Sequence, residues 1–377
     1  MIGPGDYPGV VTAPPVHRRR SPSPLPEVAP RVLLPGGTPE WGCYRGIPTT
    51  IDYGRLASPH HRDRVQRFLK HKRWMYVFAS TDALVVVAAI VDAGPTGTGF
   101  VMVTDRESGR IVADASRPGG LGPLASVNDR PTDGHRSHYA LPGTLMTIRG
   151  EGTALRLRAT LQALPFLPGL SDPWIDLDLS LESVVDGGIT AVSEIRQSRP
   201  MVTTTVKNAA LATSGQLTLR ADGVQREFDL SDGWGGFDYT SGYLPRHTAW
   251  RWAFGTYALP DGRTLGFNLV SGFTGIGDDA VENVVWIDGH PHPLDSRARI
   301  DFQDGDPASP WRVTTADGAV DLVFEPLAIH RERVNLGAVR SSFLQPTGHF
   351  RGTITAAGRR IAVERLPGVV EDQDVVW

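Results

Sequence analysis

The chain has 377 residues, of which 40% are hydrophobic and 21% are charged, and its formal net charge is -3. This length and composition are typical of a globular protein with two domains or one large β domain. The nearly neutral net charge offers no electrostatic basis for binding nucleic acid or an anionic membrane. The single cysteine, Cys43, excludes an intramolecular disulfide and a thiolate metal cluster.

The first 38 residues are rich in Pro, Gly and Arg, so they cannot bury enough apolar surface to fold alone. We expect them to form an extended arm. No basic start followed by an apolar run marks a signal peptide. The longest apolar run, Ala83 to Val91, is too short to span a bilayer. These features predict a cytoplasmic protein without a transmembrane segment, and they leave its oligomeric state open.

A short helix is expected around His60 to His71, where Val65, Phe68 and Leu69 fall on one face. Strand patterns dominate the rest of the chain, and many are joined by DG, SG or AG turns. The segments 155–161 and 175–182 alternate strictly between apolar and polar residues, as in strands with one solvated face. The run 83–91 does not alternate, which predicts a strand covered on both faces.

So many short strands at regular spacing indicate an all-β sandwich or barrel. The length suits two barrels, and a boundary near residues 223–231 divides the chain reasonably. The predicted organisation is therefore an arm at 1–38, one β domain at 39–227 and a second at 228–377.

The segment 232–252, DGWGGFDYTSGYLPRHTAWRW, holds the densest cluster of functional residue types. Alternation places Trp250 and Trp252 on one strand face, where they would form a wall for an apolar ligand. The glycine-rich stretch before them is expected to be an irregular loop that aims Asp238 at a cavity. A buried Asp238 would act as a general acid. The alternatives are core tryptophans and an aspartate that only forms a turn. The same segment supplies three further candidates for ligand binding: Tyr239, Tyr243 and His247.

Two other segments contribute polar candidates. In 281–289, alternation separates Glu282 from Asn283, so one of the two faces inward and needs a partner. Asn268 lies on the neighbouring predicted strand. Lys207 is one of three lysines, and an ammonium in a pocket would stabilise an enolate or bind a carboxylate. The alternative is that Glu282 and Lys207 lie on the solvent face.

The sequence contains no P-loop, no GxSxG elbow and no dinucleotide fingerprint followed by a helix. The His290 and His292 pair lacks the further ligands that a zinc site needs. We therefore expect neither a cofactor nor a metal site.

Several segments resemble a family of lipocalin-like proteins related to carotenoid 1,2-hydratase, the lipocalin-like Diels–Alderases and AttH-like proteins. The resemblance covers about residues 40 to 377. The segments that carry it are 72–80 (KRWMYVFAS), 237–253 (FDYTSGYLPRHTAWRWA), 266–273 (GFNLVSGF), 281–289 (VENVVWIDG) and the tail from 343 to 377. It implies two tandem lipocalin-like barrels or half-barrels with a cavity between or within them.

The resemblance also implies a lipophilic isoprenoid- or polyketide-like substrate, to which relatives add water or which they fold for cyclisation without a redox cofactor. The position that matches the family's proton donor is Asp238. It follows Phe237, where related proteins often have Trp.

Three functions remain open from the sequence. The first is a hydratase, isomerase or cyclase in which Asp238 protonates an alkene, Trp250 and Trp252 stabilise the cation and Glu282 directs water. The second is a non-catalytic carrier of a hydrophobic small molecule. The third is a carbohydrate-active enzyme that uses Asp238 and Glu282 as paired carboxylates.

Overall fold

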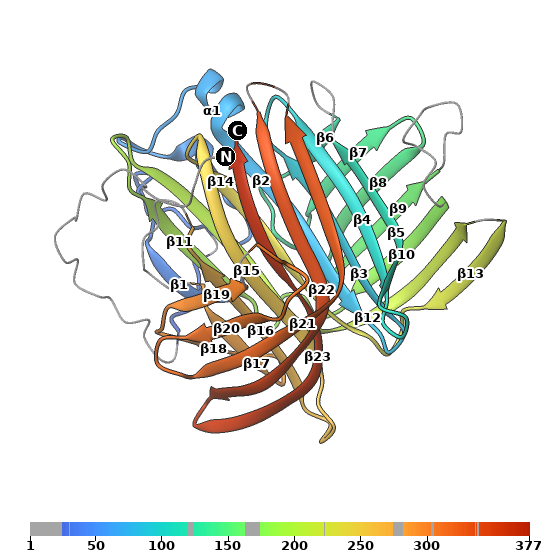
Figure 1. Cartoon of the computed structure of the whole chain (residues 1–377). Coiled ribbons are helices and arrows are strands. Elements are labelled where there is room, and N and C mark those ends of the chain that lie inside the picture. The colour runs from blue at the N-terminus through green and yellow to red at the C-terminus, as the bar shows by residue number, and fades with distance from the viewer. Residues whose placement is uncertain are drawn as a thin grey trace.

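The computed structural model describes residues 25–377 except 30, 119–123, 163–173, 222, 274–281, 303–304, 336 and 338. In these residues two curled antiparallel sheets form two half-barrels that pack against each other (Figure 1). The described residues contain one α-helix, α1 (Arg64–Lys70), and a 3-10 turn, η1 (Tyr53–Arg55). The expected mostly-β fold with two half-barrels and few short helices is confirmed.

The first sheet has 14 strands, which are β1 (Gly42–Arg45), β2 (His71–Ser80), β3 (Leu84–Asp92), β4 (Gly97–Asp105), β5 (Arg110–Pro118), β6 (Ala125–Val127), β7 (Arg136–Leu141), β8 (Thr144–Glu151), β9 (Ala154–Leu161), β10 (Trp174–Leu181), β11 (Ile189–Ile195), β12 (Met201–Ala221), β13 (Val224–Asp229) and β14 (Trp234–Tyr243).

The second sheet has nine strands, which are β15 (His247–Ala258), β16 (Thr264–Ser271), β17 (Val284–Ile287), β18 (His290–Pro293), β19 (Ala298–Phe302), β20 (Trp311–Thr315), β21 (Val320–Asn335), β22 (Arg340–Ala356) and β23 (Arg359–Val376).

The two sheets divide between Tyr243 and His247, later in the chain than the sequence pattern suggested. Strand β14 pairs with both β2 and β12, so it belongs to the first sheet and not to the second. The division between the sheets therefore lies one strand after 227/228, where the sequence predicts a domain boundary. The reason is that β14 returns to the centre of the first sheet, where its partner β2 lies far away in sequence.

Strand β14 also replaces the irregular loop that the glycines of 233–242 suggested. Among these glycines, Gly236 serves close packing between the sheets. A Cβ at Gly236 would lie 2.5 Å from the Phe254 ring of the second sheet and 2.4 Å from the Asn208 carbonyl oxygen. Glycine here lets β15 approach β14 closely, and this approach brings the next residues of both strands together.

Each half-barrel is filled by its own apolar side chains. In the first, residues such as Val77, Ile148 and Leu177 form one continuous core. In the second, Phe267 and Trp311 are completely buried among aliphatic neighbours. Of the two places expected for a cavity, between or within the half-barrels, the interiors are thus lined by clustered apolar side chains.

A third apolar cluster lies between the two sheets. We call this interface the seam. It joins Phe78, Val87 and Phe100 of the first sheet to Trp252 and Trp286 of the second. Strand β3 lies against the first core on one face and against the seam on the other, and all its residues except Val91 are buried. This arrangement confirms the prediction that its uninterrupted apolar run is covered on both sides.

Candidate functional site

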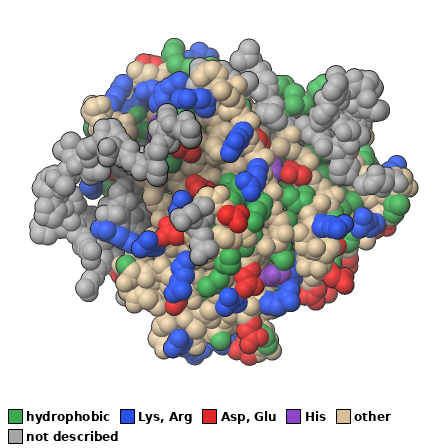
Figure 2. Space-filling view, viewed as in Figure 1, with side chains coloured by type: hydrophobic (Ala, Val, Ile, Leu, Met, Phe, Trp, Pro, Cys, Tyr) green, Lys and Arg blue, Asp and Glu red, His purple; other side chains and the backbone are tan. Residues whose placement is uncertain are grey.

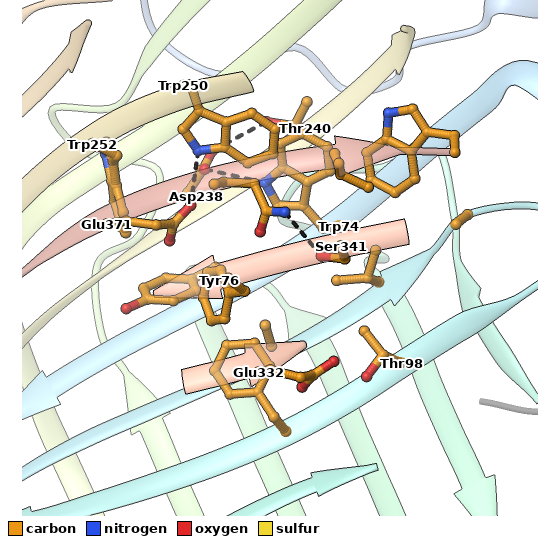
Figure 3. Close-up of a pocket in the computed structure, with 18 of the residues that line it drawn as sticks. Trp74, Tyr76, Thr98, Asp238, Thr240, Trp250, Trp252, Glu332, Ser341 and Glu371 are labelled. Carbon is orange, nitrogen blue, oxygen red and sulfur yellow. Dashed lines mark hydrogen bonds between the residues drawn. The ribbon is translucent and has the colours of Figure 1, made fainter. Parts of the chain in front are cut away.

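A cavity of about 190 Å³ opens within the seam. Both sheets line it, with Trp74, Tyr76 and Asp238 from the first and Trp252 and Glu371 from the second (Figure 3). Most of its wall is aromatic or aliphatic, and four carboxyl groups and one ammonium interrupt that surface. It is smaller than the roughly 300–1,000 Å³ of many ligand pockets, so a long hydrocarbon ligand would extend out through its mouth.

The strand register explains why polar groups converge on this cavity. Lys207 on β12, Asp238 on β14 and Tyr76 on β2 are directly opposite one another across the first sheet. Trp252 on β15 lies opposite Glu371 on β23 in the second sheet. Since side chains alternate along a strand, these two rows project toward each other across the seam.

The first polar group is an ion cluster around Lys207. Its ammonium Nζ lies 3.0 Å from Asp238 Oδ1 and 3.4 Å from Glu282 Oε2. The Thr205 hydroxyl donates a hydrogen bond to Glu282 at 3.0 Å, and the Trp74 indole N–H donates one to Asp238 at 3.2 Å. Burial alone would lower the pKa of Lys207, but the charges of Asp238 and Glu282 outweigh it and raise the pKa. The cluster is therefore a buried ammonium held between two carboxylates.

The second polar group is the carboxyl of Glu371. Burial raises the pKa of Glu371 to about 7, against 4.5 for an ordinary glutamate. Two N–H donors restrain this rise: the Trp250 indole at 2.8 Å and the Gln345 amide at 2.9 Å. The negative charge of Asp238 raises the pKa further. Near neutral pH, Glu371 thus exists both as an acid and as a carboxylate.

The aromatic rings are arranged around these groups with their faces largely occupied. Trp250 stacks between Trp74, at 5.9 Å between ring centroids, and Phe273, at 5.5 Å. The Lys207 ammonium lies 5.5 Å from the centre of the Trp252 ring, and Phe254 stacks on Trp252 at 5.5 Å. The two tryptophans line the cavity as expected. Their ring faces are largely covered by neighbouring groups, so they present mainly their N–H groups and ring edges to the site.

Residues 29–377 match the family described as "Domain of unknown function (DUF2804)". The chain belongs to the DUF2804 family. No curated protein matches it significantly.

This DUF2804 chain is similar to several solved structures at low identity. CghA is 10% identical, with a TM-score of 0.50, and the likeness covers 89% of this chain and 98% of CghA. Kievitone hydratase from Nectria haematococca is 12% identical, with a TM-score of 0.44, over 88% of this chain and 97% of the hydratase. An AttH-like protein from Nitrosomonas europaea is 13% identical, with a TM-score of 0.45, over 84% and 98%. These likenesses concern the fold alone.

Five of the ten residues singled out from the sequence line the cavity of this DUF2804 chain, and these are Lys207, Asp238, Trp250, Trp252 and Glu282. Asn268 lies directly behind it. Its side chain accepts a hydrogen bond from the Trp252 indole at 2.6 Å and donates one to the Glu282 carbonyl at 2.8 Å. Asn283 is buried and does not line the cavity. Its side chain accepts a hydrogen bond from the Val270 backbone N–H and donates one to the Ser296 carbonyl.

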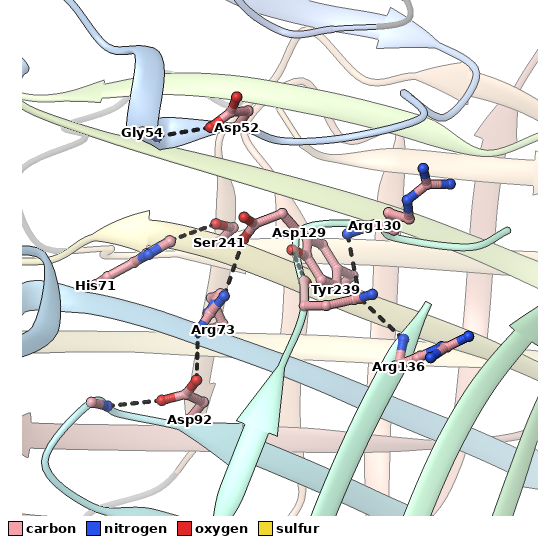
Figure 4. Close-up of polar contacts among 12 residues, drawn as sticks. Asp52, Gly54, His71, Arg73, Asp92, Asp129, Arg130, Arg136, Tyr239 and Ser241 are labelled. Atoms are coloured by element: carbon pink, nitrogen blue, oxygen red, sulfur yellow. Dashed lines mark hydrogen bonds and ion pairs between the residues drawn. The ribbon is translucent and has the colours of Figure 1, made fainter. Parts of the chain in front are cut away.

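The remaining three candidates lie elsewhere, and alternation along β14 gives the reason for two of them. Because Asp238 faces the seam, Tyr239 and Tyr243 face the core of the first half-barrel. The Tyr239 hydroxyl donates to the Asn128 carbonyl at 2.9 Å, beside the Arg73–Asp129 ion pair (Figure 4). His247 is exposed at the start of β15 and contacts Asp374 at 3.1 Å.

The sequence pattern did not single out Glu371, Trp74 or Tyr76, although all three line the cavity. Alternation in 72–80 places Trp74 and Tyr76 on one face, which is a signal for them in hindsight. Tyr76 is buried and its hydroxyl has no hydrogen-bond partner of normal geometry among the described residues. Glu371 had no local signal, because its burial depends on pairing with Trp252 more than a hundred residues earlier.

Within the described part of the chain, no group of three or more His, Cys, Asp or Glu residues is arranged to hold a metal ion. None of the helices described there is long and apolar enough to cross a membrane.

Proposed function

We propose that this protein is an acid–base enzyme of the hydratase, isomerase or cyclase type that acts on a hydrophobic unsaturated substrate held in the seam. The observation that carries the proposal is Glu371, a carboxyl group with a pKa of about 7 in the wall of a largely apolar cavity. A general acid is most effective when its pKa is near the working pH.

In the hydration reaction, the Glu371 hydroxyl transfers its proton to one alkene carbon and leaves a cation at the other. Water adds through its oxygen to that cation, and a carboxylate of the Lys207 cluster takes the proton that the water loses. Return of that proton to Glu371 through solvent restores the enzyme, so the net change is addition of one water molecule across the double bond. Loss of a proton from the cation instead of water addition gives isomerisation. Attack by a second alkene closes a ring and moves the cation to that alkene, and loss of a proton from there completes cyclisation.

The charge balance of the cavity supports a cationic transition state. Among the described residues that line it, Lys207 is the one basic side chain, against the carboxyl groups of Asp238, Glu282, Glu332 and Glu371. With Glu371 protonated, the remaining carboxylates still outnumber the ammonium. Fixed negative charges in an apolar site stabilise positive charge that develops in the reaction.

The donor role goes to Glu371 rather than to Asp238, the residue that the sequence favoured. Asp238 is engaged in an ion pair with the Lys207 ammonium at 3.0 Å. In this position Asp238 is suited to orient the water that adds to the cation. Glu371 has no cation in hydrogen-bonding contact among the described residues, and its two N–H donors come from neutral side chains.

The test compares Glu371→Gln with the matched control Asp372→Asn. Asp372 is the next residue along β23 and faces away, toward Arg251 at 3.4 Å. Purified variants are incubated with farnesol, geranylgeraniol and phenolic alkenes in oxygen-isotope-labelled water, and product mass and label are measured. We expect Glu371→Gln to lower turnover about 10²- to 10⁴-fold, and Asp372→Asn to leave it within about twofold.

Full turnover by Glu371→Gln would reject the donor assignment. If Asp238→Asn alone abolished turnover, the assignment based on sequence would replace it. Ligand retained by all variants, measured by native mass spectrometry, would show that the cavity remained intact.

A non-catalytic carrier is the second candidate, and the aromatic lining of the cavity favours it equally. It predicts a bound hydrophobic ligand and no conversion of any alkene by the native protein. The carbohydrate alternative requires two carboxylates that face each other across a free gap. The Lys207 ammonium contacts both Asp238 and Glu282, so this gap is already filled.

A further inference from the structure

Helix α1 presents an apolar face to solvent. Val65, Phe68 and Leu69 expose 66%, 56% and 50% of their surface, although the sequence pattern is that of a helix with a face to bury. No residue of α1 is buried. Single exposed apolar side chains are common, but three on one face of a two-turn helix form a patch that calls for a partner.

The charges of α1 select the kind of partner. The helix contains Arg64, Arg67 and Lys70 and no acidic residue. Beyond its start, Arg199 donates a hydrogen bond to the His61 carbonyl at 2.9 Å. Figure 2 shows Lys and Arg side chains gathered at the top of the molecule, where Figure 1 places α1, beside a hydrophobic surface. A net charge of -3 for the whole chain thus conceals a local basic patch.

This patch adjoins the wall of the cavity. Lys72, just after α1, donates hydrogen bonds to the Leu69 carbonyl at 2.9 Å and to the Ala93 carbonyl at 2.6 Å, and its ammonium lies 5.3 Å from the centre of the Trp377 ring. Ala93 and Trp377 both line the cavity. One lysine side chain therefore connects the exposed helix to the cavity wall.

Several lining residues at this end of the seam are partly exposed: Thr96 in the loop after β3, Val334 at the end of β21 and Val339 in the loop after β21. Arg340, next to Val339, pairs with Val376, so this loop lies beside the end of the chain, near α1 in Figure 1. A Cβ at Gly94 would lie 1.9 Å from the Phe68 carbonyl oxygen, so the end of α1 packs against the turn that carries the lining residues Ala93 and Thr96.

We propose that α1 docks on an anionic lipid bilayer, so that a hydrophobic ligand passes between the bilayer and the seam cavity without crossing water. Val65, Phe68 and Leu69 enter the boundary between headgroups and acyl chains, and the flanking Arg and Lys side chains contact lipid phosphates. The benefit of this docking rests on the proposed hydrophobic ligand. Membrane binding itself requires only α1.

The test is sedimentation of the full chain, without substrate, with vesicles of phosphatidylcholine alone or of an equal mixture of phosphatidylcholine and phosphatidylglycerol. We expect binding to the mixed vesicles at about 0.05 M salt and much less at about 0.5 M salt. The variant Val65→Ser/Phe68→Ser/Leu69→Ser should lose about tenfold or more in partitioning. The variant Arg64→Gln/Lys70→Gln should lose about fivefold for each charge removed.

The matched control is Leu145→Ser/Val224→Ser, which removes two other exposed hydrophobic side chains, at 55% and 57% exposure, on strands away from α1. It should bind as the native chain does. Equal binding by the triple-serine variant would overturn the proposal, as would no binding by the native chain. A mass measurement that revealed a dimer dissociated by the triple-serine change would assign the face to a second copy instead. If vesicles bound only after residues 1–24 had been removed, the apolar face of α1 would be assigned to that segment instead of to a bilayer.

Glu371→Gln separates this proposal from the proposed function. The variant should bind vesicles as the native chain does, whatever its turnover, because Glu371 lies inside the seam. Vesicle binding without any alkene conversion would leave the docking surface supported and reject the enzyme.

Discussion

The interiors of the two half-barrels and the seam between them are built from the same strands but differ in content. Adjacent residues of β14 display the difference. Tyr239 enters a filled core and donates to a backbone carbonyl, whereas Asp238 enters the seam and meets an ammonium. Apolar side chains cluster inside each half-barrel, while the seam combines apolar contacts, the cavity and the Lys207 ion cluster. Stability and chemistry are therefore separated on the two faces of one sheet.

This separation predicts that substitutions in a core lower stability and leave ligand binding intact in the molecules that remain folded, while substitutions of the cavity-lining residues in the seam change ligand binding or turnover. Four measurements test it.

The largest effect is expected in a half-barrel core. Phe267 is completely buried and packs edge-on against Phe350, with 4.9 Å between ring centroids. Phe267→Ala should lower the free energy of unfolding by about 3–5 kcal/mol, because it leaves a cavity among fixed neighbours. Urea unfolding measures this loss. A large fall in ligand affinity of the folded variant would contradict the separation.

The next effect is a dependence of stability on pH. The pKa of Glu371 is about 7 in the folded chain and near 4.5 when exposed, so the folded state favours the protonated form. This contribution is complete below pH 4.5 and is lost as the pH rises through 7. From the difference in pKa it amounts to about 3 kcal/mol.

The native chain and Glu371→Gln are compared by urea unfolding from about pH 4 to about pH 8. The difference between them should change across that range, because only the native chain carries this titration. A difference that stayed constant with pH would show that Glu371 titrates normally.

A smaller effect is expected for Trp250→Phe. The ring remains stacked between Trp74 and Phe273, but the N–H that Glu371 accepts at 2.8 Å is lost. Since this hydrogen bond lowers the pKa of Glu371, the upper limit of the pH–rate profile should move to higher pH, by about one unit or less. Stability should fall by about 1 kcal/mol. An unchanged pH–rate profile would show that the Trp250 hydrogen bond does not affect the pKa of the group that limits turnover at high pH.

The smallest effect is expected for His247→Ala. His247 is exposed and pairs with exposed Asp374, and such pairs contribute about 1 kcal/mol or less. Neither ligand binding nor turnover should change, as measured in the same assays. A clear loss of binding would restore the role in ligand binding that the sequence suggested.

The sequence predicted the fold class because strand alternation is a local property. It also predicted that 83–91 is covered on both faces and that Trp250 and Trp252 share a face. It indicated a pocket near 232–252 but left open whether the cavity lies within or between the half-barrels, because that depends on how two sheets dock. The same alternation that brings Asp238 into the seam excludes Tyr239 and Tyr243, a choice that sequence spacing leaves open until one face is identified. Glu371 could be recognised as a cavity residue only from its pairing with Trp252 in the second sheet.

The ion cluster has a consequence for assembly. Lys207 and Asp238 come from the first sheet, and Glu282 precedes β17 of the second. A slip of the sheets past each other would withdraw Glu282 from the ammonium and leave a buried carboxylate uncompensated, which is strongly unfavourable. The three charges therefore destabilise arrangements in which the two sheets dock incorrectly. This role in sheet alignment does not depend on the proposed chemistry, so we expect a relative without that chemistry to need the ion cluster as well.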